Sequence, residues 1–177
     1  MGRKSEMTAP SALNPQAIDR TAPKCVRSWP VDTPQFRIGS SDRAHVIVSP
    51  THRSWPEATN YSDSNIVDAT VEVAAGSFRG QFDAVFWTDQ FVGFRDQLVP
   101  LDQKLVGRAK FDPLEDWLSI EVEGDGKGHF RAKCIARDYP GTGNLLTFDI
   151  DFDQTELPAI LRGLNAICEA FPVVGKP

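Results

Sequence analysis

Three aspartates alternate along one predicted strand near the C-terminus, at Asp149, Asp151 and Asp153. Their spacing matches positions 1, 3 and 5 of an EF-hand loop, in which carboxylate oxygens surround a calcium ion. Position 6 is Gln154, where that loop requires glycine, and position 12 is Ile160, where it requires glutamate. The aspartates also alternate with apolar residues, which places them on the solvent face of a strand. We therefore expect no metal site here, and we interpret the three carboxylates as candidate contacts for a partner.

The histidines and cysteines form no catalytic or metal-binding motif. The chain has no HExxH sequence and no Cys/His pair with zinc spacing. His129 follows a glycine-rich turn, and with Glu123 on the opposite strand it would form an acid–base pair. A histidine that merely ends a turn near a carboxylate is the more common case, so His129 is kept only as a candidate contact residue. Cys134 and Cys168 fall on apolar faces and are expected in the core.

No motif for a bound nucleotide is present. Neither GxGxxG nor a Walker A sequence occurs. The glycine-rich residues 124–128 join two predicted strands and open no helix, so they offer no helix N-terminus to a phosphate. We expect no cofactor and no catalytic residue.

The charge of this 177-residue chain is unevenly distributed. The formal net charge is −5, but residues 1–60 hold eight basic and five acidic side chains and carry +3. Residues 61–177 hold eleven basic and nineteen acidic side chains and carry −8. An acidic balance argues against a nucleic-acid-binding protein. It suits a basic protein partner, because complementary charge speeds association.

The sequence predicts a cytoplasmic protein. Three cysteines without a CxxC motif fit a reducing compartment better than a disulfide framework. No apolar run of signal-peptide length follows the N-terminus. No stretch approaches the roughly 20 apolar residues that a membrane span requires. We expect no membrane contact.

Composition divides the chain into a tail and a domain. Residues 1–34 are rich in proline and lack periodicity, which predicts a flexible tail, and residues 35–177 are expected to form a single domain. Residues 49–65 are polar and include Pro50 and Pro56, which predicts a long loop. Trp55 lies in this loop and is a further candidate contact residue.

Hydrophobic periodicity predicts the elements of the domain. We expect strands over residues 36–38, 46–48, 66–74, 76–87, 109–111, 118–123, 129–137 and 146–152. A helix is expected from Thr88, with Pro100 bending or shortening it around residues 97–99. A second helix should run from about Thr155 to Phe171. This order predicts an α+β fold, an antiparallel, meander-like sheet of about 7–8 strands with two helices on one face.

The register of the last three strands follows from keeping their apolar residues on one face. A hairpin centred on residue 126 pairs Glu123 with His129 and Glu121 with Arg131. A second hairpin, centred on residue 142, pairs Arg131 with Asp153. The solvent face is then expected to carry a row of alternating charge.

The order of these segments resembles that of small bacterial domains related to the WapI-like immunity proteins. The resemblance covers about residues 35–171, and the predicted loop at residues 49–65 lies outside the shared pattern. Its most distinctive part is the strand WLSIEVE, the DGKGH turn, the segment LTFDIDFDQTELP and a closing helix. Upstream, the segments FRIG, VEVAAGSF and TDQFVGFRDQL follow in the expected order. The matching residues are mainly structural, so the resemblance assigns no functional residue to this chain.

The resemblance implies a small sheet-plus-helix protein that neutralises a toxin from a contact-dependent competition system. The first hypothesis is therefore a non-enzymatic protein-binding domain, most concretely an immunity protein. An accessory protein of a phage or mobile element, binding some other protein, differs from it only in partner. The alternative is a small-ligand binder, or an enzyme of unknown reaction, that uses the sheet face near His129. The oligomeric state stays open, since an edge strand near residues 36–38 or 109–111 could pair with a second copy.

Overall fold

The computed structural model describes residues 33–176, so most of the tail predicted at residues 1–34 lies outside the described part of the chain. The described residues form eight strands and three helices. In chain order these are β1 (Phe36–Ser41), β2 (Ala44–Arg53), α1 (Tyr61–Ser64), β3 (Ile66–Ala75), β4 (Phe78–Trp87), α2 (Thr88–Lys104), β5 (Val106–Phe111), β6 (Leu118–Asp125), β7 (His129–Arg137), β8 (Leu145–Asp153) and α3 (Leu157–Ala170).

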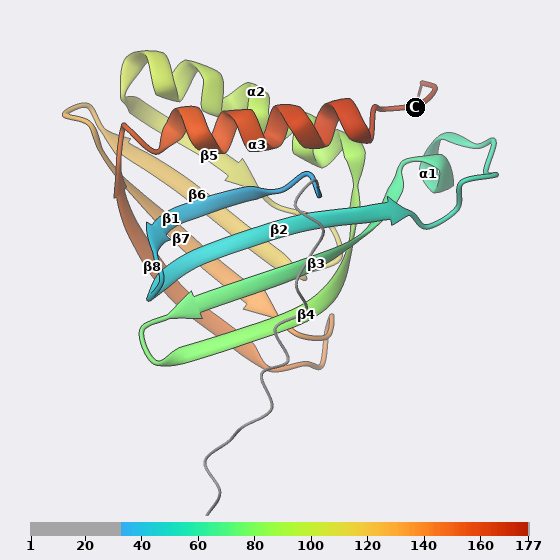
Figure 1. Ribbon diagram of the computed structural model, residues 1–177, viewed down its shortest axis with the longest axis horizontal. Helices are drawn as coiled ribbons and strands as arrows, with labels where there is room; N and C mark the ends of the chain where they lie inside the picture. The colour runs from blue at the N-terminus through green and yellow to red at the C-terminus, as the bar shows by residue number, and fades with distance from the viewer. Residues whose placement is uncertain (1–32, 177) are drawn as a thin grey trace, which may run out of the picture.

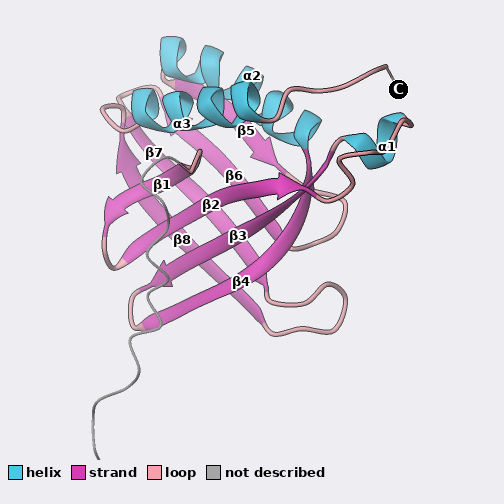
Figure 2. Cartoon of the chain, turned by 45° about the vertical axis from the view of Figure 1, so that its right-hand side comes forward, coloured by secondary structure: helices cyan, strands magenta, loops and turns pink. Residues whose placement is uncertain are grey.

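The strands form two antiparallel sheets of four, ordered β1-β2-β3-β4 and β5-β6-β7-β8. The predicted α+β class and strand number are confirmed, and the strands divide between two sheets because α2 separates β4 from β5. The sheets cross each other, with α2 and α3 lying together along one end of both (Figures 1 and 2). They approach closely where β1 meets β8, since a Cβ built on Gly39 would lie 2.8 Å from Cγ2 of Ile150.

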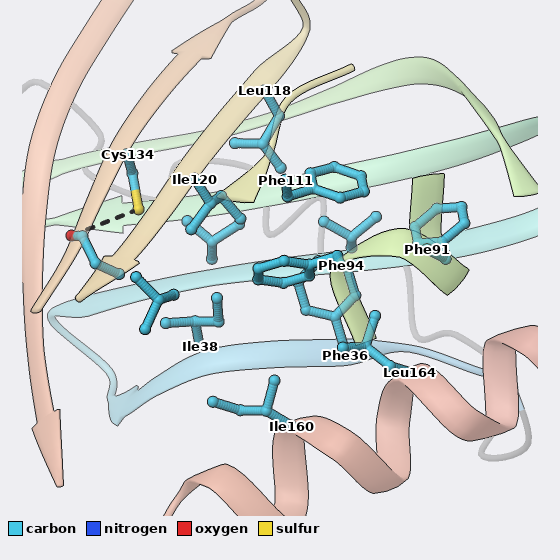
Figure 3. Close-up of a cluster of buried hydrophobic side chains, with 14 of the residues drawn as sticks. Phe36, Ile38, Phe91, Phe94, Phe111, Leu118, Ile120, Cys134, Ile160 and Leu164 are labelled. Carbon is cyan, nitrogen blue, oxygen red and sulfur yellow. Dashed lines mark hydrogen bonds between the residues drawn. The ribbon is translucent and has the colours of Figure 1, made fainter. Parts of the chain in front are cut away.

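An aromatic cluster joins the two sheets to α2 (Figure 3). Phe111 of β5 lies at its centre. Its ring centroid is 5.9 Å from that of Phe36, 5.4 Å from Phe86, and 5.5 Å from both Phe91 and Phe94. Because these rings come from β1, β4, α2 and β5, they make one shared core for both sheets.

The closing helix covers β1. Leu157, Ile160, Leu164 and Ile167 recur at helical spacing and are all buried, as the apolar stripe predicts. Ile160 and Leu164 point from α3 toward β1 in Figure 3. Gly163 allows α3 to pack closely on β1, because a side chain at this position would meet the backbone of Gln35 and Phe36.

Helix α2 continues past Pro100 to Lys104, so of the predicted bending or shortening around residues 97–99 the shortening does not occur. Proline removes the amide that would bond to the carbonyl four residues earlier, that of Asp96. Both residues are exposed, so water can satisfy that carbonyl. The opposite face, which includes Phe91 and Leu98, is buried and holds the helix in place. The helix ends at Lys104, and the C-cap residue Leu105 has a left-handed backbone conformation with a φ of 61°.

The loop predicted at residues 49–65 is shorter than expected. Strand β2 continues to Arg53 and the single-turn helix α1 begins at Tyr61, which leaves residues 54–60 between them. Pro50 is accommodated because β2 beyond Val48 has only β3 as a ladder partner and shifts register between Pro50 and His52.

The predicted register of the last three strands is wrong by two residues in each hairpin, although the buried face is right. Glu123, not Glu121, lies opposite Arg131, and Asp151, not Asp153, lies on its other side. The cause is turn geometry, because both turns are held by an aspartate side chain that accepts backbone hydrogen bonds, at Asp125 and Asp138. A shift of two residues preserves which face each side chain occupies.

Candidate functional site

The β6–β7 turn is organised around the carboxylate of Asp125. Its Oδ1 accepts the backbone N–H groups of Lys127 at 2.7 Å and His129 at 3.2 Å. Gly126 and Gly128 have φ values of +79° and +91°, which suit glycine. The imidazole Nδ1 of His129 lies 3.2 Å from Oδ2 of Asp125. His129 therefore pairs with the carboxylate of its own turn, and the predicted pair with Glu123 does not form.

The turn between β8 and α3 lies against the β6–β7 turn. The backbone N–H of Gln154 donates to the carbonyl of Gly128 at 2.9 Å. Asp153 accepts hydrogen bonds from the backbone N–H and the hydroxyl of Thr155. Glu156 follows directly, before α3 begins. Contact between the two turns thus brings residues nearly thirty positions apart in the sequence into one site.

Rows of alternating charge cross the outer face of the second sheet. One row runs from Arg108 on β5 through Glu123 and Arg131 to Asp151 on β8. Arg108 lies 3.1 Å from Glu123, and Arg131 makes two hydrogen bonds to Asp151, at 2.8 and 3.4 Å. The neighbouring row comprises Lys110, Glu121, Lys133 and Asp149. Such exposed pairs each contribute at most about 1 kcal/mol, so the rows mainly fix strand register.

A pocket of about 740 Å³ opens beside the two turns. Its lining comprises Glu123, Gly124, Asp125, His129, Phe130, Arg131, Asp151, Phe152, Asp153 and Glu156. Five carboxylates and one guanidinium give this lining a formal charge of −4 when His129 is neutral. The rings of Phe130 and Phe152 are buried and stacked on each other at 5.4 Å. We call this feature the acidic pocket.

The aspartates of the acidic pocket are held in their ionised forms. The backbone N–H of Lys127 lowers the pKa of Asp125 below its ordinary value. The hydrogen bond from Arg131 lowers the pKa of Asp151, and that from Thr155 lowers the pKa of Asp153. At neutral pH the pocket therefore presents fixed negative charge and hydrogen-bond acceptors, which suit a cationic group.

The described residues offer little for covalent or metal chemistry. Burial raises the pKa of Cys134 to about 12, so its thiol is not an activated nucleophile. Within residues 33–176, no group of three or more His, Cys, Asp or Glu side chains could hold a metal ion.

The acidic pocket brings together three of the five predicted contact residues, His129, Asp151 and Asp153. Asp149 lies on the same face of β8 but does not line the pocket. Trp55 is 61% exposed and lies in the loop before α1, at the opposite end of the molecule from the β6–β7 turn (Figure 1). The predicted contacts therefore form two separate surfaces.

Three acidic residues of the pocket, Glu123, Asp125 and Glu156, were not predicted as contacts from the sequence. Asp125 had a local signal, since aspartate before glycine is typical of a turn in which the carboxylate bonds to the following amides. Glu156 had no such local signal in the sequence, because it reaches the pocket only through the packing of the β8–α3 turn on the β6–β7 turn. Glu123 was considered only as a partner for His129.

The comparisons with known proteins identify the family. The model of the immunity protein WapI-like family matches residues 37–172. The chain belongs to this family. The matched range includes residues 49–65, which the resemblance seen in the sequence left outside the shared pattern. No curated protein matches the chain. A crystal structure of Trypanosoma brucei MRP1/MRP2 is similar over 79% of this chain and 87% of that one, with 12% identity and a TM-score of 0.43.

Membership in the WapI-like family gives the general kind of activity. A family of immunity proteins implies a protein toxin as partner and an action that is generally non-enzymatic. No helix within residues 33–176 is long and apolar enough to cross a membrane.

Proposed function

We propose that this WapI-like protein is a cytoplasmic immunity protein that binds a basic surface of its toxin through the acidic pocket. The observation that carries the proposal is the gathering of five carboxylates around one concave surface. Three of them have lowered pKa values and stay charged at neutral pH. Lysine and arginine side chains of a toxin would donate hydrogen bonds to these oxygens.

The charge of the whole domain supports the same proposal. Residues 61–177 carry a formal charge of −8, so a basic toxin would be drawn toward the domain before contact. Electrostatic steering raises the association rate, which matters for an inhibitor that must act before its toxin does. Asp149 and the exposed Trp55 are secondary candidate contacts, because neither lies in the acidic pocket.

Co-expression with the toxin encoded beside this protein tests the function. The protein should restore growth and should form a complex with the toxin in a pull-down. If it neither rescues growth nor forms a complex, the immunity role is wrong.

A charge-reversal pair tests the site. Asp151→Lys should weaken toxin binding about tenfold or more, because it reverses a charge of the pocket. Within residues 33–176, the side-chain hydrogen bonds of Asp151 are all to Arg131. The matched control is Glu169→Lys, the same change at an exposed position of α3 away from the pocket. Binding is measured by calorimetry and folding by circular dichroism. Equal affinities of the two folded variants would assign toxin binding to another surface.

Binding of a small cationic ligand is the second candidate function. A volume of about 740 Å³ falls within the range of ligand pockets, and the His129–Asp125 pair lies at its wall. The test is an NMR titration with small diamines, following the amide resonances of residues 123–131. Saturable shifts in the wild type that Asp151→Lys abolishes would support ligand binding. Shifts only at millimolar concentration, without saturation, would contradict it.

A further inference from the structure

Helices cover both edge strands that the sequence suggested for self-association. A Cβ built on Gly163 would lie 2.3 Å from the carbonyl oxygen of Gln35, so α3 packs directly on the start of β1. On β5, the side-chain amide of Gln97 from α2 bonds to both the N–H and the carbonyl of Lys110, at 2.9 and 3.3 Å. These contacts block the pairing of either strand with another chain.

Strand β8, the other edge of the second sheet, is protected by like charge. Asp149, Asp151 and Asp153 alternate along its outer face. In an antiparallel pair of two β8 strands, residues of this face lie opposite one another. If two β8 strands pair about one of these aspartates, aspartates of the two chains lie opposite one another. Repulsion between their negative charges makes this pairing unfavourable.

Among the described residues 33–176, no strand pairs with the outer edge of β4 in the first sheet. Strand β4 lies at the end of the order β1-β2-β3-β4, at the rim away from α2 and α3 in Figure 2. The backbone N–H of Thr88 donates to the backbone carbonyl of Asn65, so this even-numbered residue continues the β3–β4 ladder. The backbone N–H of the next residue back, Trp87, donates instead to the side-chain oxygen of Gln90. Because bonded and non-bonded pairs alternate in an antiparallel ladder, the odd-numbered residues of β4 direct their backbone groups away from β3.

The side chains of β4 are complementary to a second copy of the same strand. When two β4 strands pair antiparallel about Gln81, Arg79 lies opposite Asp83 of the partner subunit, and the reciprocal pair forms by symmetry. Both side chains are exposed. Arg79 donates a hydrogen bond to the backbone carbonyl of Asp42 at 2.8 Å, and Asp83 accepts one from the hydroxyl of Thr70 at 3.5 Å, but within residues 33–176 neither makes an ion pair. Shifting the centre by one residue, to residue 80 or 82, removes both pairs.

The other face of β4 fits the same register. Phe82 would lie opposite Gly80 of the partner subunit, where the absent side chain leaves room for the ring. Phe78, which is 68% exposed, would lie opposite Ala84 of the partner subunit and lose water-exposed apolar surface. Charge, shape and the direction of the backbone groups therefore select one register.

We propose that this protein forms a two-fold symmetric dimer in which β4 pairs antiparallel with β4 of a second copy, centred on Gln81. The two first sheets then form one continuous eight-stranded sheet. The inference is independent of the proposed immunity function, because β4 contributes no residue to the acidic pocket.

Two charge-reversal variants of the full chain test the dimer by analytical ultracentrifugation. The wild type should be a dimer. Arg79→Glu places glutamate opposite Asp83 of the partner subunit, and Asp83→Arg places two arginines together, so each variant alone should be a monomer. An equimolar mixture of the two should form a heterodimer, since each chain then supplies the charge that the other lacks. The double variant Arg79→Glu/Asp83→Arg should again be a homodimer.

Circular dichroism of each variant shows that folding is retained, because all the replaced side chains are exposed. A wild type that stays monomeric over its whole soluble concentration range overturns the proposal. A dimer that neither single reversal weakens, or two monomeric variants that fail to associate when mixed, overturns it as well.

Discussion

At the scale of single residues, Asn65 connects three segments of the fold through one buried amide. Its side-chain nitrogen donates to the carbonyls of Tyr61 and Val174, each at 2.8 Å. Its side-chain oxygen accepts the N–H of Val174 at 2.8 Å and the hydroxyl of Thr88 at 3.0 Å. Asn65 is fully buried, so its side chain depends on these partners rather than on water for its hydrogen bonds. The C-terminal segment is thereby held against α1 and the start of α2.

We predict that Asn65→Ala lowers the free energy of unfolding by about 2–4 kcal/mol, because it leaves buried donors and acceptors without partners. Urea denaturation measures this loss, and hydrogen exchange should become faster at Val174. The matched control is Asn165→Ala on the exposed face of α3, which should change stability by less than about 0.5 kcal/mol. Equal effects of the two substitutions would contradict this role of Asn65.

The pocket aspartates lead to a pH prediction. A carboxyl whose pKa is lower in the folded than in the unfolded protein contributes stability above its unfolded pKa, about 3.9 for aspartate. That contribution is lost as the pH falls through the lowered folded pKa. We therefore expect the charges of Asp125, Asp151 and Asp153 to contribute fully to stability at pH values above about 3.9, the unfolded value. Asp125, Asp151 and Asp153 should protonate only below about pH 4.

Carbon-13 NMR titration of Arg131→Gln tests the cause of one shift. The pKa of Asp151 should rise toward 3.9, since the hydrogen bond from Arg131 is the main reason that it is low. Asp125 provides an internal control, because its pKa is lowered by backbone N–H groups that this substitution leaves in place. A pKa of Asp151 that does not change would show that the guanidinium is not the cause.

At the scale of elements, the two helical glycines Gly163 and Gly93 have opposite roles. A Cβ on Gly163 would lie 2.3 Å from the carbonyl of Gln35, a backbone atom that cannot move without displacing β1. A Cβ on Gly93 would meet nothing within 4 Å. Glycine is therefore required for packing in α3 but not in α2.

We predict that Gly93→Ala stabilises the protein by about 0.5–1 kcal/mol, through the better helix propensity of alanine. Gly163→Ala gains the same propensity but must separate α3 from β1, and we expect a net loss of about 1–3 kcal/mol. Thermal and urea denaturation of the pair measure both changes. Stabilisation by Gly163→Ala would show that the contact between α3 and β1 relaxes easily.

Elements were predicted well where one periodicity governed them and poorly at their ends. The alternation in β6, β7 and β8 and the apolar stripe of α3 are local patterns, and the structure confirms them. The continuation of β2 through Pro50 and of α2 through Pro100 depends on tertiary packing, which holds both elements in place although proline lacks an amide hydrogen. Hairpin register was wrong because it depends on the side-chain bonds of Asp125 and Asp138.

At the scale of the whole molecule, Phe111 makes the two sheets one cooperative unit. Its ring contacts four aromatic rings, contributed by β1, β4 and α2. We predict that Phe111→Ala lowers the free energy of unfolding by about 3–5 kcal/mol, through lost apolar burial and the cavity left behind. The control Leu114→Ala, at a side chain that is 80% exposed, should change stability by less than about 0.5 kcal/mol.

Two probes of the same unfolding experiment test the shared core. Tryptophan fluorescence and far-ultraviolet circular dichroism should give coincident transitions in the wild type and in Phe111→Ala. Two separate transitions would show that the sheets unfold independently.

The sequence by itself determined the α+β class, the order of the strands and the two long helices, and which face of most elements is buried. These properties follow from hydrophobic periodicity, which acts over a few neighbouring residues. It also placed Asp151, Asp153 and His129 on an exposed charged surface.

Only the tertiary structure decided how the eight strands divide between two sheets, which strand edge stays open, and which carboxylates share a pocket. Glu156 and Asp125 meet because two turns far apart in the chain pack together. Within residues 33–176, β4 is left as an open edge, whereas α3 covers β1 and α2 covers β5. Contacts of this kind depend on the packing of complete elements against one another, a property that no local pattern of residues encodes.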